Sequence, residues 1–398
     1  MNYITLLKNN KNLRILASVQ FIVYFGAWFS QTGVYTLLVN LNAPTWAISM
    51  SAVLAFVPGI LLAPINGVIV EKAKPKKLLI SMASIELFTI FSLIFINNLT
   101  MLWLLFILIF IRLCVASIYF QGEMSLLAKI LTTEELKLAN EMHSIIWAVS
   151  YTSGMAISGI FIHIFGIKNA FLFDTFLIFI AILFLLNIKI PNIIQNINNN
   201  LNFLLMIKDG FSYVVKNKII INLIFLHAFV GITAYDTLVT LLAKVEYKEV
   251  LSASLVIGFL NAIRACSLAI GPMILSKFIN EKTLTYMFLG QAFGIMLWAF
   301  TQFNFYISFI GLLAAGFFTS SLWSYTYTLI QKHCDNKYYG RVIAYTDMVY
   351  LSFSAIVSAL TGILYELNIS LKMITILLGI AFIIASFYWH LFRKKYIN

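Results

Sequence analysis

Ionisable side chains within long apolar runs are the residues of this sequence best able to do chemistry. Arg112 stands in LLFILIFIRLCVAS, Glu86 stands in ISMASIELFTIF, and Glu123 follows further along the run that contains Arg112. A charge in hydrocarbon is costly unless it is paired or hydrated, so such residues mark paths for ions or polar cargo. At a rise of about 1.5 Å per helical residue, the depths allow Arg112 to pair with Glu86, while Glu123 is another possible partner. We interpret all three as candidates for proton coupling.

A second group of ionisable residues lies in the second half of the chain. Asp236, in GITAYDTLVTLL, is the carboxylate that we expect to bind a proton, since a buried acid near an arginine can titrate near neutral pH; the alternative is an acid at the wet end of a helix. His227 is either a proton switch or a hydrogen-bonded packing residue. Arg264 matches Arg112 in depth and is a further candidate for proton coupling. Asp174 is expected to cap a helix or bind a neighbouring positive charge.

Polar-edged aromatic and amide side chains recur in the same apolar runs. Flat rings with a few hydrogen-bonding groups suit an amphipathic small molecule, although aromatic belts and core packing predict the same residue types. The candidates for a substrate cavity are Trp28, Gln31, Tyr35, Tyr235, Asn261, Trp323 and Tyr327.

Composition indicates the elements that must position these residues. The chain of 398 residues is 61% hydrophobic and 11% charged, whereas soluble domains are about 45–50% apolar and about 25% charged. A membrane helix needs about 20 mostly apolar residues. Twelve such spans are predicted, at residues 14–39, 45–70, 77–97, 100–126, 139–165, 168–189, 218–242, 250–276, 283–302, 305–331, 341–365 and 370–391.

Lysine and arginine cluster in alternate loops, from Lys8, Lys11 and Arg14 at the start to Lys394 and Lys395 at the end. Basic loops stay in the cytoplasm, so we expect both termini there. An Asn-rich, partly amphipathic stretch at 191–217 separates two halves with similar loop patterns. The sequence therefore predicts an all-α integral membrane protein with two pseudo-symmetric six-helix bundles, at 1–190 and 218–398, as in secondary transporters.

One loop carries a family resemblance. GVIVEKAKPKK, from Gly67 to Lys77, resembles the Gly-x-x-x-Asp-Arg-x-x-Arg-Arg signature of the major facilitator superfamily, with Glu71 in place of Asp and Lys72 and Lys76 in place of Arg. The resemblance implies a major facilitator fold, and it implies that this loop latches the outward-facing state. The alternative is that the basic cluster is only a topology signal.

Other stretches resemble one branch of that superfamily, the drug and siderophore exporters related to macrolide efflux proteins. They are NKNLRILASVQFIVYFGAWFSQTG, TTEELKLANEMHSIIWAVSYTSGMAISGIFIHIFGIKNAFLFD and YYGRVIAY. RLCVA, which begins at Arg112, is similar to the family's Arg-x-x-Gln-Gly signature but departs from it, with Ala116 in place of the Gly. The resemblance implies that Arg112 takes part in proton coupling.

Missing motifs exclude several classes. The sequence has no GxxxxGK[ST] loop, so it has no ATP-driven motor of its own, and its three cysteines form no metal-binding spacing. The basic residues do not form a patch interleaved with aromatics, which argues against nucleic acid. We expect no cofactor and no metal.

The expected function is therefore a proton-coupled exporter of a small amphipathic compound, such as a drug, a macrolide-like molecule or a siderophore. We expect a monomer in the bilayer of a bacterial cytoplasmic membrane, working by alternating access. One alternative is an importer of a nutrient or metal chelate. Another, from a different class, is a membrane-embedded sensor or enzyme without transport.

Overall fold

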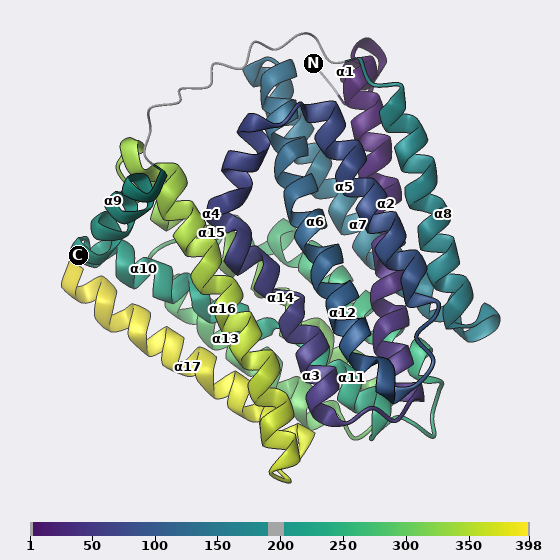
Figure 1. Ribbon diagram of the computed structural model, residues 1–398. Coiled ribbons are helices and arrows are strands. Elements are labelled where there is room, and N and C mark those ends of the chain that lie inside the picture. The colour runs from purple at the N-terminus through teal and green to yellow at the C-terminus, as the bar shows by residue number, and fades with distance from the viewer. Residues whose placement is uncertain (1–2, 190–202, 397–398) are drawn as a thin grey trace. The chain divides into compact units, whose positions relative to one another are not determined.

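The computed structural model describes residues 3–189 and 203–396, and all regular structure in these ranges is helical (Figure 1). The α-helices are α1 (Tyr3–Asn9), α2 (Lys11–Asn40), α3 (Thr45–Leu54), α4 (Val57–Lys72), α5 (Pro75–Leu93), α6 (Leu102–Ile130), α7 (Thr133–Phe165), α8 (Ile167–Leu186), α9 (Phe203–Lys216), α10 (Lys218–Ala228), α11 (Asp236–Lys244), α12 (Ala253–Leu275), α13 (Leu284–Thr301), α14 (Phe305–Phe317), α15 (Thr319–His333), α16 (Tyr339–Glu366) and α17 (Leu371–Tyr396). Short 3₁₀ helices are η1 (Leu99–Met101), η2 (Phe229–Thr233) and η3 (Asn336–Tyr338).

Polar residues next to the apolar runs fix where several helices begin and end. Thr132 and Glu135 form a capping box at the start of α7, in which each side chain bonds the other's backbone amide. Asn217 caps α10 by accepting from the amides of Ile219 and Ile220. Gly166 ends α7 with a φ of 85°, a conformation that favours glycine.

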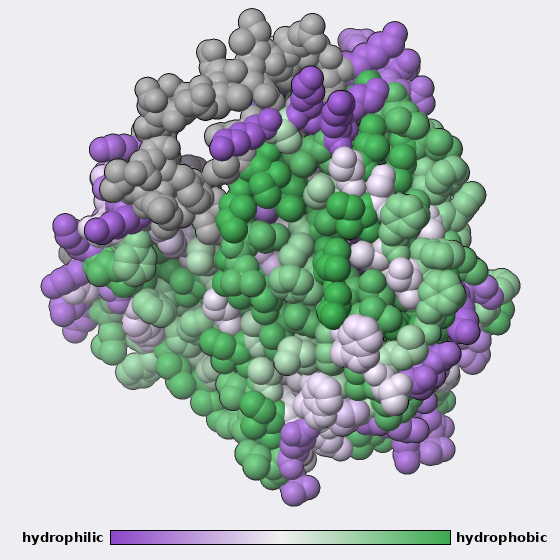
Figure 2. Space-filling model, viewed as in Figure 1, coloured by the Kyte–Doolittle hydropathy of each residue, from purple (hydrophilic) through white to green (hydrophobic). Residues whose placement is uncertain are grey.

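The predicted membrane fold is confirmed. Within the described residues, eleven helical segments are long and apolar enough to cross a bilayer, and they coincide with eleven of the twelve expected spans. The remaining span corresponds to α5, whose 19 residues include the charges of Lys76, Lys77 and Glu86. Large apolar side chains are widely exposed, such as Phe88 at 67% and Phe387 at 67%. Figure 2 shows hydrophobic residues covering most of the viewed helices and hydrophilic residues near the helix ends, as lipid contact requires.

Three spans expected as continuous helices are interrupted. The span at 45–70 breaks between α3 and α4, just before Pro58, which cannot donate a backbone hydrogen bond. The span at 218–242 consists of α10, η2 and α11, and the span at 305–331 breaks at Phe318, between α14 and α15. Broken helices free backbone groups inside a membrane protein, where they can bind ions or side chains.

Contacts divide the chain into two compact units. Of the described residues, unit 1 comprises 3–43, 61–189 and 252–262, and unit 2 comprises 44–60, 203–251 and 263–396. Each unit therefore includes a short segment from the other half of the sequence. The two six-helix halves with a central linker remain a prediction.

Within unit 1, α2 packs against α7 and α8, and α5 packs against α6 and α8. Within unit 2, α13 packs against α14 and α17, while α16 packs against α3, α10 and η2 (Figure 1). These contacts bring α5, α6 and α8 together in one unit and α10, α15 and α16 together in the other.

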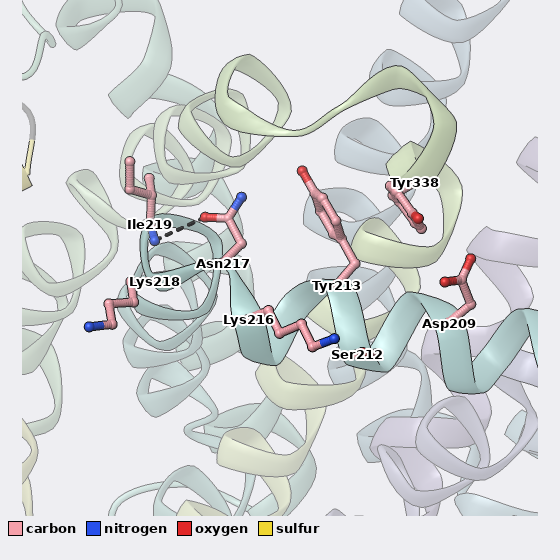
Figure 3. A pocket seen from close by; sticks show the side chains of 8 residues that line it. All are labelled: Asp209, Ser212, Tyr213, Lys216, Asn217, Lys218, Ile219 and Tyr338. Carbon is pink, nitrogen blue, oxygen red and sulfur yellow. Dashed lines mark hydrogen bonds between the residues drawn. The ribbon is translucent and has the colours of Figure 1, made fainter.

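Helix α9 falls in the stretch that the sequence predicts to be partly amphipathic. The Asp209 carboxylate binds Arg341 at 2.9 Å, and Tyr213 stacks on Tyr338 with ring centroids 4.2 Å apart. Beside this stack lies an open cavity of about 560 Å³, lined by residues of the α9–α10 corner that include Lys216 (Figure 3). These contacts fasten α9 to the start of α16.

Substitution of Tyr213 by alanine is expected to release α9. The change removes the ring stack and the hydrogen bond that the amide of Asp335 donates to the Tyr213 hydroxyl. At about 1 kcal/mol for each interaction, amide exchange over 208–216 should accelerate about 10-fold or more. Val215→Ala, at a half-exposed position on the same helix, is the control. Equal exchange in both variants would show that the stack does not hold α9.

Candidate functional site

A buried ion cluster in unit 1 joins three helices. Arg112 of α6 lies 3.6 Å from the Glu86 carboxylate of α5 and 3.5 Å from the Asp174 carboxylate of α8. The side chains of Glu86 and Asp174 are 5% and 0% exposed. We call Glu86, Arg112 and Asp174 the ion cluster. Of the two pairings that the sequence left open for Arg112, the structure shows the one with Glu86.

Helix α2 completes the surroundings of the ion cluster. Arg112 also approaches the backbone carbonyl of Ala27 at 3.4 Å, and the hydroxyl of Ser30 donates to Asp174. Gly26 lies against the second carboxylate oxygen of Asp174, which has no hydrogen-bond partner among the described residues. One side of this carboxylate is thus available for a proton.

Glu123 does not belong to the ion cluster. It is fully buried on α6, and no lysine or arginine nitrogen of the described residues lies within ion-pair distance of it. It is a second buried ionisable residue on α6, the helix that carries Arg112. At about 1.5 Å per residue, it stands about 16 Å further along α6, toward the end that carries Lys129.

Arg264 of α12 binds the interrupted span at 218–242 in unit 2. Its guanidinium donates to the carbonyl of Thr233, at the end of η2, over 2.7 Å, and lies 5.1 Å above the ring of Tyr235. Tyr235 is fully buried and also contacts Trp298, so it supports Arg264 and does not line an open surface. Asp236 is half-buried in the first turn of α11. Its role in proton binding remains a prediction.

An aromatic box surrounds His227 in unit 2. The imidazole ring lies 5.7 Å from Trp323, 5.4 Å from Tyr327 and 5.4 Å from Tyr350, measured between ring centroids. Trp323 and Tyr327 stack on each other at 4.9 Å. His227 Nδ1 and the Thr326 hydroxyl are 2.9 Å apart. The sequence named three members of this box, but Tyr350 was missed, because tyrosine is too common in this chain to single one out.

The remaining cavity candidates lie in unit 1. Trp28 is half-buried and stacks on Tyr151 at 4.3 Å. Gln31 is half-buried and Tyr35 is buried, both on α2 with Trp28. Asn261 is buried and donates to the carbonyl of Ile257 on its own helix. The structure joins Trp28 to another aromatic ring but does not assign any of these residues to a ligand.

Within the signature stretch from Gly67 to Lys77, Lys76 in the first turn of α5 contacts the end of α8. Lys76 donates to the carbonyls of Leu186 and Ile188, at 2.6 and 2.9 Å, just where α8 ends. Lys72 is exposed. The surroundings of Gly67 and the side chain of Glu71 lie outside what the structure describes, so the latch remains a prediction.

Replacing Lys76 with methionine is expected to weaken unit 1. The change removes two charge-assisted hydrogen bonds to carbonyl groups at the end of α8, which contribute about 1.5–3 kcal/mol each at most. The melting temperature in detergent should fall by several degrees. Lys77→Met, at the exposed neighbouring position, should leave it unchanged. A Lys76→Met melting temperature equal to that of Lys77→Met would mean that the contact contributes no stability.

No group of three or more metal-ligating side chains occurs within the described ranges. What the two sites can offer chemically is different. The ion cluster combines two buried carboxyl groups with one guanidinium, and the aromatic box combines an imidazole with three aromatic rings.

Comparison with known proteins shows what kind of chain carries these sites. The profile of the Major Facilitator Superfamily matches residues 16–358. A Bacillus subtilis (strain 168) protein described as the uncharacterized MFS-type transporter YfiS is 23% identical over 221 residues, which are 54% of this chain and 52% of the relative. The match thus spans about half the length of that relative.

Solved structures share the fold. The nucleoside transporter NupG superposes with a TM-score of 0.76 at 15% identity, covering 97% of this chain and 98% of NupG. A POT family transporter in complex with 5-aminolevulinic acid gives a TM-score of 0.73 at 13% identity, covering 97% of this chain and 96% of the other. At such identities the likeness establishes the fold alone.

Proposed function

This chain belongs to the Major Facilitator Superfamily, and we propose that it is a proton-coupled exporter of a small amphipathic compound. The family and its relatives indicate a membrane transporter rather than an enzyme or a sensor. The observation that carries the proposal is the composition of the ion cluster, in which two buried carboxyl groups face a single guanidinium.

Charge balance indicates that the ion cluster binds one proton. With Glu86 and Asp174 both ionised, the cluster would hold one uncompensated negative charge in a buried site, which costs several kcal/mol. One bound proton restores neutrality, because Arg112 stays positive throughout. Movement of α5 or α8 away from Arg112 would change which carboxyl keeps that proton. Proton uptake and release are thereby tied to helix movement.

Glu123 offers a second proton-binding group between the ion cluster and the cytoplasm. A carboxyl that is fully buried without a cation in ion-pair reach is neutral at rest. Its position on α6, between Arg112 and the lysine-bearing end, makes it an intermediate stop for a proton on its way from the ion cluster to the cytoplasm. Arg264, bound to the broken span, is proposed to support cargo binding in unit 2 and not to carry protons.

Helix α15 supports an amphipathic cargo. Its sequence TSSLWSYTYTLIQKH is far more polar than that of α14, and its exposed positions include Trp323, Ser324 and Thr328. Exposed hydroxyl groups are unfavourable against lipid, so this face is suited to a water-filled cavity. Aromatic rings next to hydroxyl groups bind molecules with an apolar body and a polar edge.

The resemblance to drug and siderophore exporters supports outward transport. We also propose that both termini lie in the cytoplasm and that the working form is a monomer. The test is accumulation in everted vesicles across a panel of dyes, macrolides and siderophores, with and without a proton uncoupler. We expect uncoupler-sensitive accumulation of at least one compound. Uptake only in right-side-out vesicles would reverse the direction to import, and no response to the gradient for any compound would contradict the proposal.

Two carboxylate variants identify the proton site. Asp174→Asn and Asp236→Asn are each expected to abolish gradient-driven accumulation at unchanged protein level, while cargo still moves down its own gradient. Asp335→Asn, an exposed change outside the spans, is the control. Wild-type accumulation by the Asp236 variant would remove Asp236 from the coupling path, and wild-type accumulation by the Asp174 variant would remove the ion cluster.

A further inference from the structure

We propose that the cargo is a flat aromatic molecule with an N–H or O–H donor, and that His227 Nε2 accepts its hydrogen bond. The inference rests on the proposed function and adds the chemical class of the cargo. It starts from the hydrogen bonds of one hydroxyl group, which determine what the imidazole of His227 can offer a ligand.

The Thr326 hydroxyl fixes the tautomer of His227. Its oxygen lies 2.7 Å from the carbonyl of Leu322 and 3.2 Å from that of Trp323. Both carbonyls can only accept, so the single hydroxyl proton of Thr326 goes to the nearer one. The hydroxyl oxygen must then accept from His227 Nδ1, 2.9 Å away. Nδ1 therefore carries the imidazole proton.

The opposite nitrogen of the ring is left as an acceptor. His227 is 0% exposed, and no carboxylate of the described chain lies within ion-pair distance, so burial keeps the imidazole neutral. With its proton on Nδ1, the neutral ring bears a lone pair on Nε2. This atom is buried and has no hydrogen-bond partner among residues 3–189 and 203–396. A buried unsatisfied acceptor is unfavourable unless something supplies a donor.

The surrounding rings determine the shape of what can reach Nε2. Trp323 and Tyr327 stack with planes only 18° apart, and the ring centroid of Tyr350 lies 5.4 Å from that of the imidazole. Trp323 is 38% exposed, so it is the outer wall of the box. In this proposal a ligand reaches Nε2 when the Trp323 side chain rotates, and exposed side chains change rotamer rapidly. A flat aromatic ring can replace the contacts that Trp323 gives up.

A hydrogen-bond donor on the aromatic ring of the cargo then determines how tightly the cargo binds. A molecule that places an N–H or O–H at Nε2 satisfies the acceptor, whereas its N-methyl or O-methyl analogue leaves Nε2 unpaired in a dry site. Sites built around a hydrogen bond discriminate strongly against analogues that lack it. Protonation of His227 is the competing role, but the box holds no carboxylate to stabilise an imidazolium.

The test is equilibrium dialysis of each probe against the purified full chain in detergent. The probes are three matched pairs, namely indole and 1-methylindole, norharmane and 9-methylnorharmane, and 2-naphthol and 2-methoxynaphthalene. We expect the donor-bearing member of at least one pair to bind about 10-fold or more tightly than its methylated partner. Equal affinities within every pair, or no binding by any probe, would overturn the proposal.

Two substitutions locate the effect at Nε2. The Gln amide reaches the position of Nε2, whereas the shorter Asn amide overlies Nδ1. We therefore expect His227→Gln to keep part of the discrimination and His227→Asn to lose it, with His390→Asn, an exposed histidine, as the control. Discrimination that survives in His227→Asn would assign the acceptor to another residue. Binding needs no gradient, so failure here is distinguishable from failure of proton coupling.

Discussion

Replacing Arg112 with methionine is expected to abolish gradient-driven transport and to destabilise unit 1. The variant leaves two buried carboxyl groups, Glu86 and Asp174, without the guanidinium that lies 3.6 and 3.5 Å from them. Removing one partner of a buried ion pair costs about 3–5 kcal/mol. Both carboxyls must then hold protons, so neither can release one during a transport cycle. Thermal melting in detergent and accumulation in everted vesicles measure the two effects.

A triple variant separates stability from coupling. Arg112→Met with Glu86→Gln and Asp174→Asn removes every charge of the ion cluster and leaves no uncompensated group. Replacing a whole buried ion cluster by neutral residues is often neutral for stability. We expect the melting temperature to recover while coupled transport stays lost. Arg14→Met, an exposed change, controls for loss of one positive charge. Coupled transport by the triple variant would show that the cluster is only structural.

The fold could be predicted because lipid imposes strong rules on sequence. Each span needs a long apolar run, and eleven of the twelve predicted runs reappear as membrane-length helices. Helix ends were readable in the same way, as in TTEE at the start of α7, where Thr132 and Glu135 cap each other. These signals are local, so one chain segment is enough to display them.

The composition of the ion cluster could not be predicted in full, because pairing across helices depends on how each helix is rotated. Helix α8, IKNAFLFDTFLIFIAILFLL, is apolar on all sides, so its sequence has no stripe that shows which way Asp174 faces. The sequence assigned Asp174 only to capping or to a neighbouring positive charge. An acid in so apolar a run was the available signal, and its partner proved to be Arg112.

The break in the seventh span was missed for a related reason. Gly231 lies where any side-chain carbon would come within 2.6 Å of the Tyr350 carbonyl, on a helix more than a hundred residues away. The regular α-helix is interrupted at this contact between η2 and α16. The sequence GITAYD alone gives no sign of the interruption. The interruption then presents the Thr233 carbonyl to Arg264. The contact between η2 and α16 thus leaves the Thr233 carbonyl outside a regular α-helix, where it accepts a hydrogen bond from Arg264.

Substituting Gly258 with valine is expected to prevent close packing of the two helices that meet there in unit 1. A side-chain carbon at Gly258 would lie 2.8 Å from the Cα of Gly159 and 2.8 Å from the carbonyl oxygen of Met155. Both neighbours are backbone of α7 and cannot turn aside, so the helices must separate. Small residues at such crossings allow close helix contact in membranes, and overpacking costs about 1–3 kcal/mol.

Transport should suffer more than stability in this variant, because the crossing joins residues from the two halves of the sequence. In the alternating-access cycle proposed above, this crossing forms and separates in each turnover. We expect transport to fall about 10-fold or more, since about 1.4 kcal/mol changes an equilibrium tenfold. Gly340→Ala, a position with open space around it, is the matched control. Wild-type transport by Gly258→Val would mean that α7 and the 252–262 segment need not approach closely during the cycle.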